Sequence, residues 1–375
     1  MFRSLKKTSA LIATLFSLSF LASCSSSATP SLKGASISED AKFGSANILV
    51  SQGEFEKLGF QLGDSCDIAF SNGYSLQDVP YYNGYYVKNG DPVLVAYPGN
   101  EYVQITLNNT GIWFPACLEE GFTVEVTLRE AKKYLTTQEA LGQDYSVDRS
   151  SYSSDEEFCN FRALKGGNLK ENLIYRGASP VDNKRGRASF VDSLTERKGI
   201  KAIVDLADSE ENMQSYLSSV SFSSPYAESL YDEGDVALLS MGSGYGGEAY
   251  QKKVVEGFRH MLKHQAPYYV HCLEGKDRTG FVCTLIEALA GASYQEMKED
   301  YMVTYRNYYK VTLEETPEKY EAIASLYFDS FCEYLHGTSD IVSLRTASYV
   351  EDAKEYLRMG GMNLDEIQSF ISLVC

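Results

Sequence analysis

The stretch Tyr268-Tyr269-Val270-His271-Cys272-Leu273-Glu274-Gly275-Lys276-Asp277-Arg278-Thr279-Gly280 decides the fold of the C-terminal part of the chain. Residues 268–271 have the composition of a short buried strand, and residues 279–289 that of an apolar helix. The loop between them, residues 272–278, contains a glycine that lets the backbone bend and approach its neighbours closely. The stretch therefore predicts a strand–loop–helix unit.

Such a unit turns successive backbone N–H groups toward one point, at the positive end of a helix dipole. This cradle fits a tetrahedral dianion such as a phosphoryl group. The same field, together with Arg278, favours the thiolate form of Cys272, which is then placed for in-line attack on phosphorus. The planar guanidinium of Arg278 can hold two phosphoryl oxygens. The predicted phosphate-binding residues are Leu273, Glu274, Gly275, Lys276, Thr279 and Gly280.

The Cys-x5-Arg spacing of Cys272 and Arg278, followed by Thr279, resembles the signature of the protein-tyrosine-phosphatase superfamily. The longer run, residues 271–282, is similar to the atypical branch of bacterial tyrosine and lipid phosphatases. Residues 173–178 and 203–206 look like the early strands of that branch, so the resemblance covers the chain from about residue 160 to its C-terminus. It implies a cysteine-dependent phosphatase that hydrolyses phosphate monoesters through a phosphocysteine.

The general acid is the least determined part of the predicted site. A leaving oxygen needs a proton, and most relatives supply it from an Asp on a separate upstream loop. The corresponding stretch here, residues 238–247, contains no acid. Asp277 inside the loop is therefore the first candidate, and its alternative role is to balance the two neighbouring cations. Asp208 is the second candidate, followed by Asp232 and Asp235.

Three hypotheses concern the substrate or ligand. The resemblance implies phosphorylated proteins with phosphotyrosine as the first substrate class. Lys276 adds a cation that phosphotyrosine alone does not need, and similar loops with lysine occur in relatives that act on phosphoinositides. Phosphoinositides and inositol phosphates are therefore the second class. The third hypothesis, from another class, is a surface lipoprotein that only binds phosphate, or whose N-terminal module binds a host or wall ligand.

The N-terminus has the pattern of a signal peptide, residues 1–23. Three basic residues precede a short apolar stretch that is too short for a comfortable membrane span. It ends in Leu21-Ala22-Ser23-Cys24, which resembles the lipobox of bacterial lipoproteins. The resemblance implies that Cys24 carries the lipid and that the protein is anchored to the membrane outside the cytoplasm, since two or more acyl chains anchor a protein stably. Residues 24–40 predict a flexible tether.

The remaining chain divides at about residue 142. Residues 41–141 read as short strands separated by turn signals such as Ser71-Asn72-Gly73, which predicts a small all-β barrel or sandwich. Its aromatic cluster, residues 78–86, is explained either by strand packing or by a binding surface. Residues 142–157 are polar and acidic and predict a linker.

From residue 158 to residue 375, strand-like and helical segments give way to a long helical region. The pattern indicates an α/β fold with a central, mostly parallel sheet flanked by helices. Such sheets bind ligands at the carboxyl ends of their strands, which is where Cys272 lies in the sequence.

The formal net charge is −17 at pH 7, and without the first 23 residues the chain carries 31 basic and 51 acidic side chains, a net charge of −20. Such a body repels nucleic acid, so we expect no nucleic-acid partner. Eight cysteines without a CxxC pair argue against a disulfide scaffold and a structural zinc site, and the predicted cradle needs no metal or other cofactor. The sequence leaves open the oligomeric state and whether Cys66 and Cys117 pair.

Overall fold

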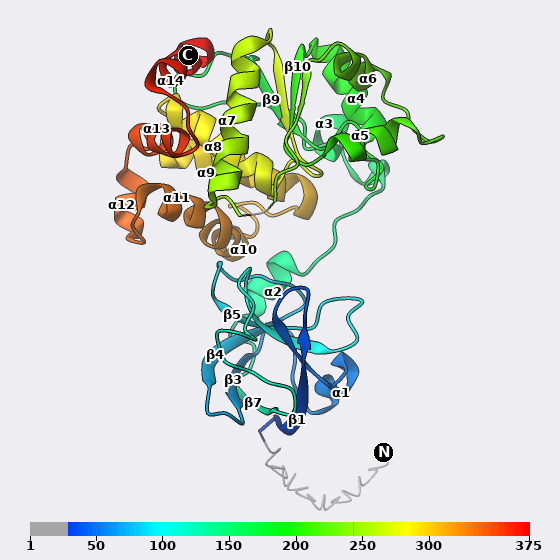
Figure 1. Cartoon of the computed structure of the whole chain (residues 1–375), viewed down its shortest axis with the longest axis vertical. Coiled ribbons are helices and arrows are strands. Elements are labelled where there is room, and N and C mark those ends of the chain that lie inside the picture. The colour runs from blue at the N-terminus through cyan, green and yellow to red at the C-terminus, as the bar shows by residue number, and fades with distance from the viewer. Residues whose placement is uncertain (1–28, 243) are drawn as a thin grey trace, which may run out of the picture.

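The computed structural model describes residues 29–242 and 244–375 (Figure 1). An N-terminal barrel precedes a larger domain in which helices surround a sheet. The predicted signal peptide and Cys24 lie outside the described residues. Within the described residues, no helix combines the length and the apolar character needed to cross a membrane.

In the described chain, seven strands close into a barrel in the order β1-β2-β6-β5-β4-β3-β7, and only β4 and β5 among the neighbours are parallel. Alternate side chains point inward, as in β7, where Val124 and Val126 are buried and Glu125 is exposed. The only tryptophan of the sequence, Trp113, packs in this core. The strands are β1 (Ser31–Asp40), β2 (Ser45–Ile48), β3 (Ser65–Phe70), β4 (Ser75–Tyr82), β5 (Pro92–Val95), β6 (Val103–Leu107) and β7 (Thr123–Glu130).

The prediction of a flexible tether over residues 24–40 is wrong for its second half. Residues 31–40 form β1, which pairs with both β2 and β7 and so closes the barrel. Ile37 is the side chain of β1 that is buried in the barrel core, at 2% exposure. The composition of the strand, with three Ser, one Gly and one Ala among ten residues, does not indicate a strand, because pairing with β2 and β7 and not local propensity stabilises it.

The predicted linker over residues 142–157 is also partly wrong. Two aromatic side chains in this segment pack on the C-terminal domain: Tyr152 is buried against Phe158, and Tyr145 stacks on Tyr308 with ring centroids 4.6 Å apart. A short helix, α3 (Asp155–Phe158), already belongs to that domain. In the barrel, Cys66 is buried and Cys117 is exposed, and both are free thiols.

The C-terminal domain is built on a sheet with the strand order β11-β10-β12-β9-β8. The pairs β11–β10, β10–β12 and β12–β9 are parallel, and β8 is antiparallel to β9. The register places Gly177, Asp205 and His271, the last residues of three adjacent strands, side by side. The strands are β8 (Arg162–Ala163), β9 (Ile174–Gly177), β10 (Ala202–Asp205), β11 (Val236–Leu238) and β12 (Tyr268–His271).

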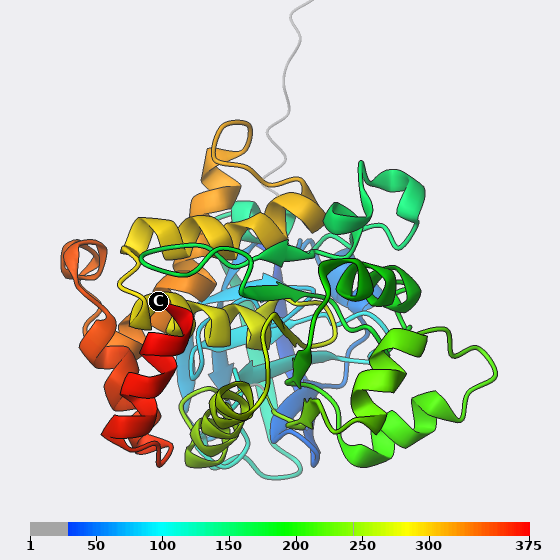
Figure 2. The same cartoon turned by 90° about the horizontal axis from the view of Figure 1, so that it is seen from above.

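Both faces of this sheet are covered by helices. Successive residues of its strands point to opposite faces, and the side chains on each face are buried in a core of their own. Val204 and Val270 pack in one core with α7 and α8, whereas Ile203 and Tyr269 pack in another with α4, α5 and α6. Figure 2 shows the green helices α4–α6 on one side of the sheet and the red helices α13 and α14 on the other.

The helices after β9 fall into a first set that lies between the strands or directly follows the last strand, β12, and a second set that comes after α8. The first set is α4 (Ala188–Lys198), α5 (Glu210–Leu217), α6 (Pro225–Asp232), α7 (Glu248–Lys263) and α8 (Asp277–Leu289). The second set is α9 (Tyr294–Tyr309), α10 (Pro317–Ile323), α11 (Asp329–His336), α12 (Ile341–Thr346), α13 (Val350–Met359) and α14 (Leu364–Val374).

The barrel and the C-terminal domain meet through helices. In Figure 1, α2 (Leu135–Leu141), at the end of the barrel, lies against α10. The other barrel helix, α1 (Gln52–Lys57), lies farther from the C-terminal domain. Ala140 and Leu141 of α2 are buried in the core of the C-terminal domain, so the two domains share apolar surface.

The role of β1 yields a test of stability. Ile37→Ala is expected to lower the free energy of unfolding by about 2–5 kcal/mol, because it leaves a cavity in the barrel core. The matched change Lys33→Ala, at an exposed position of the same strand, is expected to alter it by less than about 0.5 kcal/mol. Urea unfolding followed by the fluorescence of Trp113 measures both. Equal small effects would show that residues 31–40 are a tether after all.

Candidate active site

The loop singled out in the sequence lies at the carboxyl edge of the sheet, directly after β12. The coil extends over residues 272–276, and α8 begins at Asp277, two residues earlier than predicted. Asp277 and Arg278 therefore stand on the first turn of the helix, where an acidic residue interacts favourably with the helix dipole. Cys272 is buried, with 4% of its surface exposed.

The carbonyl groups of this loop are bound from outside. Each of three consecutive carbonyl oxygens accepts a hydrogen bond from a different part of the domain, at 2.8–3.1 Å. The pairs are Ser179 N to Leu273 O, Tyr308 Oη to Glu274 O, and both Asn160 Nδ2 and Arg176 Nη2 to Gly275 O.

The N–H groups of the same loop are left for another partner. Within the described residues, the backbone N–H groups of Leu273, Glu274, Gly275 and Lys276 make no hydrogen bond. Buried backbone donors are nearly always paired in folded proteins, and the N-terminus of α8 adds its own unpaired N–H groups. Unpaired donors next to Cys272 and at the start of a helix can bind a tetrahedral oxyanion.

Position 275 requires a glycine for two reasons, the φ angle of its backbone and the atoms that surround it. Its φ is +67°, a left-handed conformation that side chains disfavour. A Cβ atom there would lie 2.3 Å from the carbonyl carbon and oxygen of Gly177, at the end of β9. The loop can therefore approach the backbone of β9 only because position 275 is glycine.

Arg278 is oriented toward the cavity of the site. Its Nη1 donates a hydrogen bond to the carbonyl oxygen of Met241 at 2.9 Å, so the connection between β11 and α7 fixes one side of the guanidinium. A cavity of about 630 Å³ opens here and is lined by Asp277, Arg278, Tyr250 and Phe281 among others. The arrangement places a cation, Arg278, near the unpaired N–H groups of the loop, which is a combination that can bind a phosphate.

Residues 156–371, more than half of the chain, match the tyrosine phosphatase family. The chain belongs to the tyrosine phosphatase family. No curated protein matches the chain at a significant level. Membership of the family supports a phosphatase activity for the C-terminal domain, which is hereafter called the phosphatase domain.

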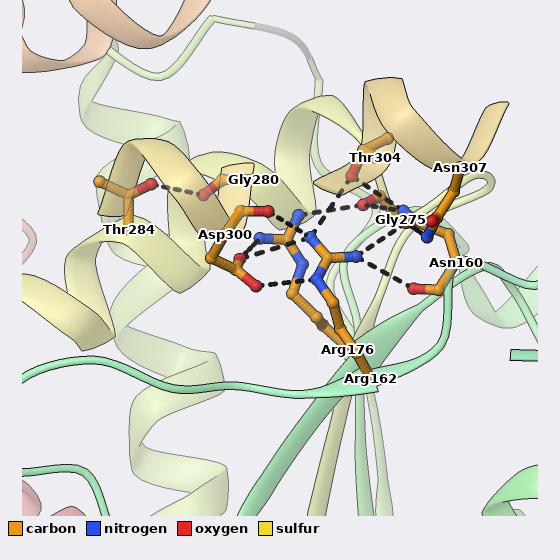
Figure 3. Close-up of polar contacts among 9 residues, drawn as sticks. All are labelled: Asn160, Arg162, Arg176, Gly275, Gly280, Thr284, Asp300, Thr304 and Asn307. Atoms are coloured by element: carbon orange, nitrogen blue, oxygen red, sulfur yellow. Dashed lines mark hydrogen bonds and ion pairs between the residues drawn. The ribbon is translucent and has the colours of Figure 1, made fainter. Parts of the chain in front are cut away.

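The loop of this phosphatase rests on a buried ionic network that sequence reasoning missed (Figure 3). Asp300 on α9 binds Arg176 Nη1 at 2.6 Å and Arg162 Nε at 2.8 Å, and Arg162 Nη1 binds the side chain of Asn160 at 2.7 Å. Although burial alone would raise it, the two arginines hold the pKa of Asp300 below its usual value. Asn160 and Arg176 thus reach Gly275 with their side chains fixed.

The other residues predicted to bind phosphate, Thr279, Gly280 and Glu274, differ in their burial and in their contacts. Thr279 is fully buried, and its Oγ1 has no hydrogen-bond partner in the described part of the chain. Gly280 is needed for packing, since a Cβ there would lie 2.5 Å from the ring of Tyr301. Glu274 accepts hydrogen bonds from Tyr145 and from Arg185, so its carboxylate supports the loop.

Lys276 and His271 differ in charge. Burial alone would lower the pKa of Lys276, but Asp277, Tyr309 and Glu274 hold it well above its ordinary value, so Lys276 is a cation. Burial lowers the pKa of His271 to about 4, and its Nδ1 donates to the carbonyl oxygen of Cys272 at 3.3 Å. His271 is therefore neutral and binds the carbonyl group of Cys272.

The structure separates the candidates for the general acid. Asp277 lines the cavity beside Arg278 with a 62% exposed side chain. Asp208 is buried, and burial together with Asp205 raises its pKa to about 6. Asp232 and Asp235 precede β11 and so lie at the amino edge of the sheet, opposite to the loop. They are wrong candidates, because a parallel strand separates them from the site.

The contact between Gly275 and Gly177 predicts the effect of one added methyl group. Gly275→Ala is expected to lower kcat/KM by about 100-fold, because the loop must shift by a sizeable fraction of an ångström to relieve the clash. Gly199→Ala is the matched control: Gly199 has a similar φ of +65°, but a Cβ there meets no atom within 4 Å. Gly199→Ala should lower the free energy of unfolding by about 1 kcal/mol and leave kcat/KM unchanged. Equal activities of the two variants would contradict the assigned role of Gly275.

Proposed function

We propose that the chain is a cysteine-dependent phosphatase that hydrolyses phosphate monoesters through a phosphocysteine. The observation that carries this proposal is the set of inward backbone N–H groups next to Cys272, whose carbonyls are bound from outside the loop. Directed donors of this kind stabilise the charge of a phosphoryl group in the transition state without reorganisation.

In the first step, the phosphoryl oxygens bind to the loop N–H groups and to Arg278. The sulfur of Cys272 attacks phosphorus, and the bond from phosphorus to the leaving oxygen breaks. Asp277, on the cavity side of the loop, gives its proton to the leaving oxygen. The products of this step are the free alcohol and the phosphocysteine.

In the second step, a water molecule attacks the phosphocysteine. The carboxylate of Asp277 takes a proton from the water, the bond between phosphorus and sulfur breaks, and inorganic phosphate leaves. The ammonium group of Lys276 lies 3.8 Å from the carboxylates of both Glu274 and Asp277. Its positive charge offsets the negative charge of these carboxylates and of the phosphoryl group at the entrance of the loop.

Two substrate classes follow for this reaction. Protein phosphotyrosine is supported by membership of the tyrosine phosphatase family. Phosphoinositides or inositol phosphates are the alternative, supported by Lys276, although its two carboxylate neighbours partly neutralise this cation. A side-by-side measurement of kcat/KM on phosphopeptides and phosphoinositides separates the two classes.

We also propose that the protein is anchored by a lipid on Cys24 to the outer side of the cytoplasmic membrane. This proposal is supported by the basic and apolar N-terminal pattern and by Leu21-Ala22-Ser23-Cys24. Labelling cells with a radioactive or clickable fatty acid tests it: the wild-type protein should take up the label, and Cys24→Ala should not.

Removal of the nucleophile gives the first test of the chemistry. Cys272→Ser is expected to lower kcat on para-nitrophenyl phosphate by at least about 10⁴-fold, since the two-step route is lost. Cys375→Ser, at an exposed cysteine remote from the loop in sequence, is the control and should retain full activity. Persistent turnover by Cys272→Ser would refute the mechanism. No turnover by the wild type together with tight phosphate binding would favour a binding protein.

The role of Asp277 predicts a dependence on the leaving group. Asp277→Asn is expected to lower kcat by about 10²-fold or more on alkyl phosphates, whose leaving oxygen needs a proton. The loss should be much smaller on para-nitrophenyl phosphate, whose leaving group is stable as an anion.

The alternative acid makes a different prediction. With its pKa raised to about 6, Asp208 would be protonated only below that pH, so kcat would fall as the pH rises through about 6. A pH profile of kcat for the wild type, Asp277→Asn and Asp208→Asn decides between them. If only Asp208→Asn removes the falling limb, Asp277 is not the acid.

A further inference from the structure

The active-site cavity has a second wall, and that wall belongs to the barrel. The connections β4–β5 and β6–β7 face the phosphatase domain across the cavity, opposite Asp277 and Arg278. Figure 1 shows the barrel directly below the side of the phosphatase domain that carries α10. The polar residues of this barrel wall are Tyr85, Lys88, Asn89, Asn108 and Asn109.

Contacts between the domains hold the barrel wall in place. Lys88 Nζ binds both carboxylate oxygens of Glu333 on α11 at 2.8 Å. Tyr86 packs against the core of the phosphatase domain as well as against a cluster of barrel residues. Because these contacts flank the cavity, the wall does not depend on the substrate for its position.

The wall presents neutral hydrogen-bonding groups that are already oriented. Asn109 Nδ2 donates to Asn89 Oδ1 at 2.6 Å, Asn108 Nδ2 donates to Val87 O at 2.7 Å, and Tyr85 Oη donates to Gln104 at 3.3 Å. Within the described chain, Asn89 Nδ2 and the Oδ1 atoms of Asn108 and Asn109 make no further hydrogen bond. The cavity thus offers both donors and acceptors on the side away from the phosphate.

The charge of the cavity limits what the leaving group can carry. Among the described residues that line it, Lys88 and Arg278 are the cations. Glu333 neutralises Lys88, and the proposed chemistry assigns Arg278 to the reacting phosphate. The nearby cation Lys276 lies 3.8 Å from the carboxylates of both Glu274 and Asp277, which partly neutralise it. The net charge of the chain is −17, so a second phosphate on the leaving group would meet repulsion with little free positive charge to offset it.

We propose that this barrel wall is a leaving-group subsite that selects phosphate monoesters of uncharged, hydroxyl-rich alcohols, namely sugars or cyclitols that bear one phosphate. Hydroxyl groups donate and accept, as the asparagine side chains require. A volume of about 630 Å³ is within the usual range for small-molecule sites. A phenol leaving group has no hydroxyl groups for these amides. The inference rests on the proposed phosphatase chemistry and goes beyond it.

The test uses the full-length protein and four substrates: glucose 6-phosphate, inositol 1-phosphate, a phosphotyrosine peptide and para-nitrophenyl phosphate. Asn89→Ala and Asn108→Ala are each expected to lower kcat/KM on the hydroxyl-rich phosphates by about fivefold to tenfold, the effect of one neutral hydrogen bond. On para-nitrophenyl phosphate the change should stay within about twofold. Gln61→Ala is the matched control, since Gln61 is an exposed barrel carboxamide outside the cavity.

The outcomes separate this inference from the chemistry on which it rests. Equal losses on all substrates, no loss on any, or a wild-type preference for the phosphotyrosine peptide would overturn the subsite while Cys272 remains the nucleophile. Turnover that persists in Cys272→Ser would overturn the phosphatase mechanism itself. A monophosphorylated phosphoinositide in mixed micelles adds a lipid arm: its leaving alcohol carries a phosphodiester charge, so the wild type should hydrolyse it with a lower kcat/KM than inositol 1-phosphate, and an equal or higher kcat/KM would overturn the selection for uncharged alcohols.

Discussion

A loop of five residues can direct its N–H groups toward one point only if its carbonyl groups are held elsewhere. Here the carbonyl oxygen of Gly275 is held by Asn160 and Arg176, and those of its two predecessors by Ser179 and Tyr308. Asp300 keeps the two supporting arginines charged and in place inside the domain. The geometry of Cys272 and the first turn of α8 follow from this outer set of hydrogen bonds.

The position of the candidate loop between a strand and a helix could be predicted from the sequence, because that pattern is local. Cys272 and Arg278 are six residues apart, and a strand before them and a helix after them are enough to predict a cradle. The supports were not predictable, because Asn160 and Asp300 belong to segments far from the loop in the chain. Nothing in the spacing of either residue distinguishes it from an ordinary surface polar group.

The barrel shows the same division between local and distant information. The alternation in residues 122–128 predicts a strand, which the structure places at β7, whereas β1 has the composition of a linker and is a strand only because β2 and β7 pair with it. The aromatic run that ends at Tyr86 was ambiguous between packing and binding. The structure divides it, with Tyr81 in the barrel core, Tyr82 buried in a smaller cluster with Val93 and Val95, and Tyr85 at the cavity. Residues 78–86 thus contribute both to the core of the barrel and to the lining of the cavity next to the phosphatase domain.

The residues that hold the carbonyl groups of the loop are far from it in the sequence, and this separation determines when during folding the site can form. Arg176 and Asn160 lie 99 and 115 residues before Gly275, and Asn307, which binds Asn160, lies farther toward the C-terminus. Contacts of such separation form late, because long stretches of chain must first be ordered. During synthesis, the loop after Cys272 therefore lacks part of the network that holds its carbonyl groups until α9 has left the ribosome, so the arrangement of its N–H groups is completed only after residue 309 has been synthesised.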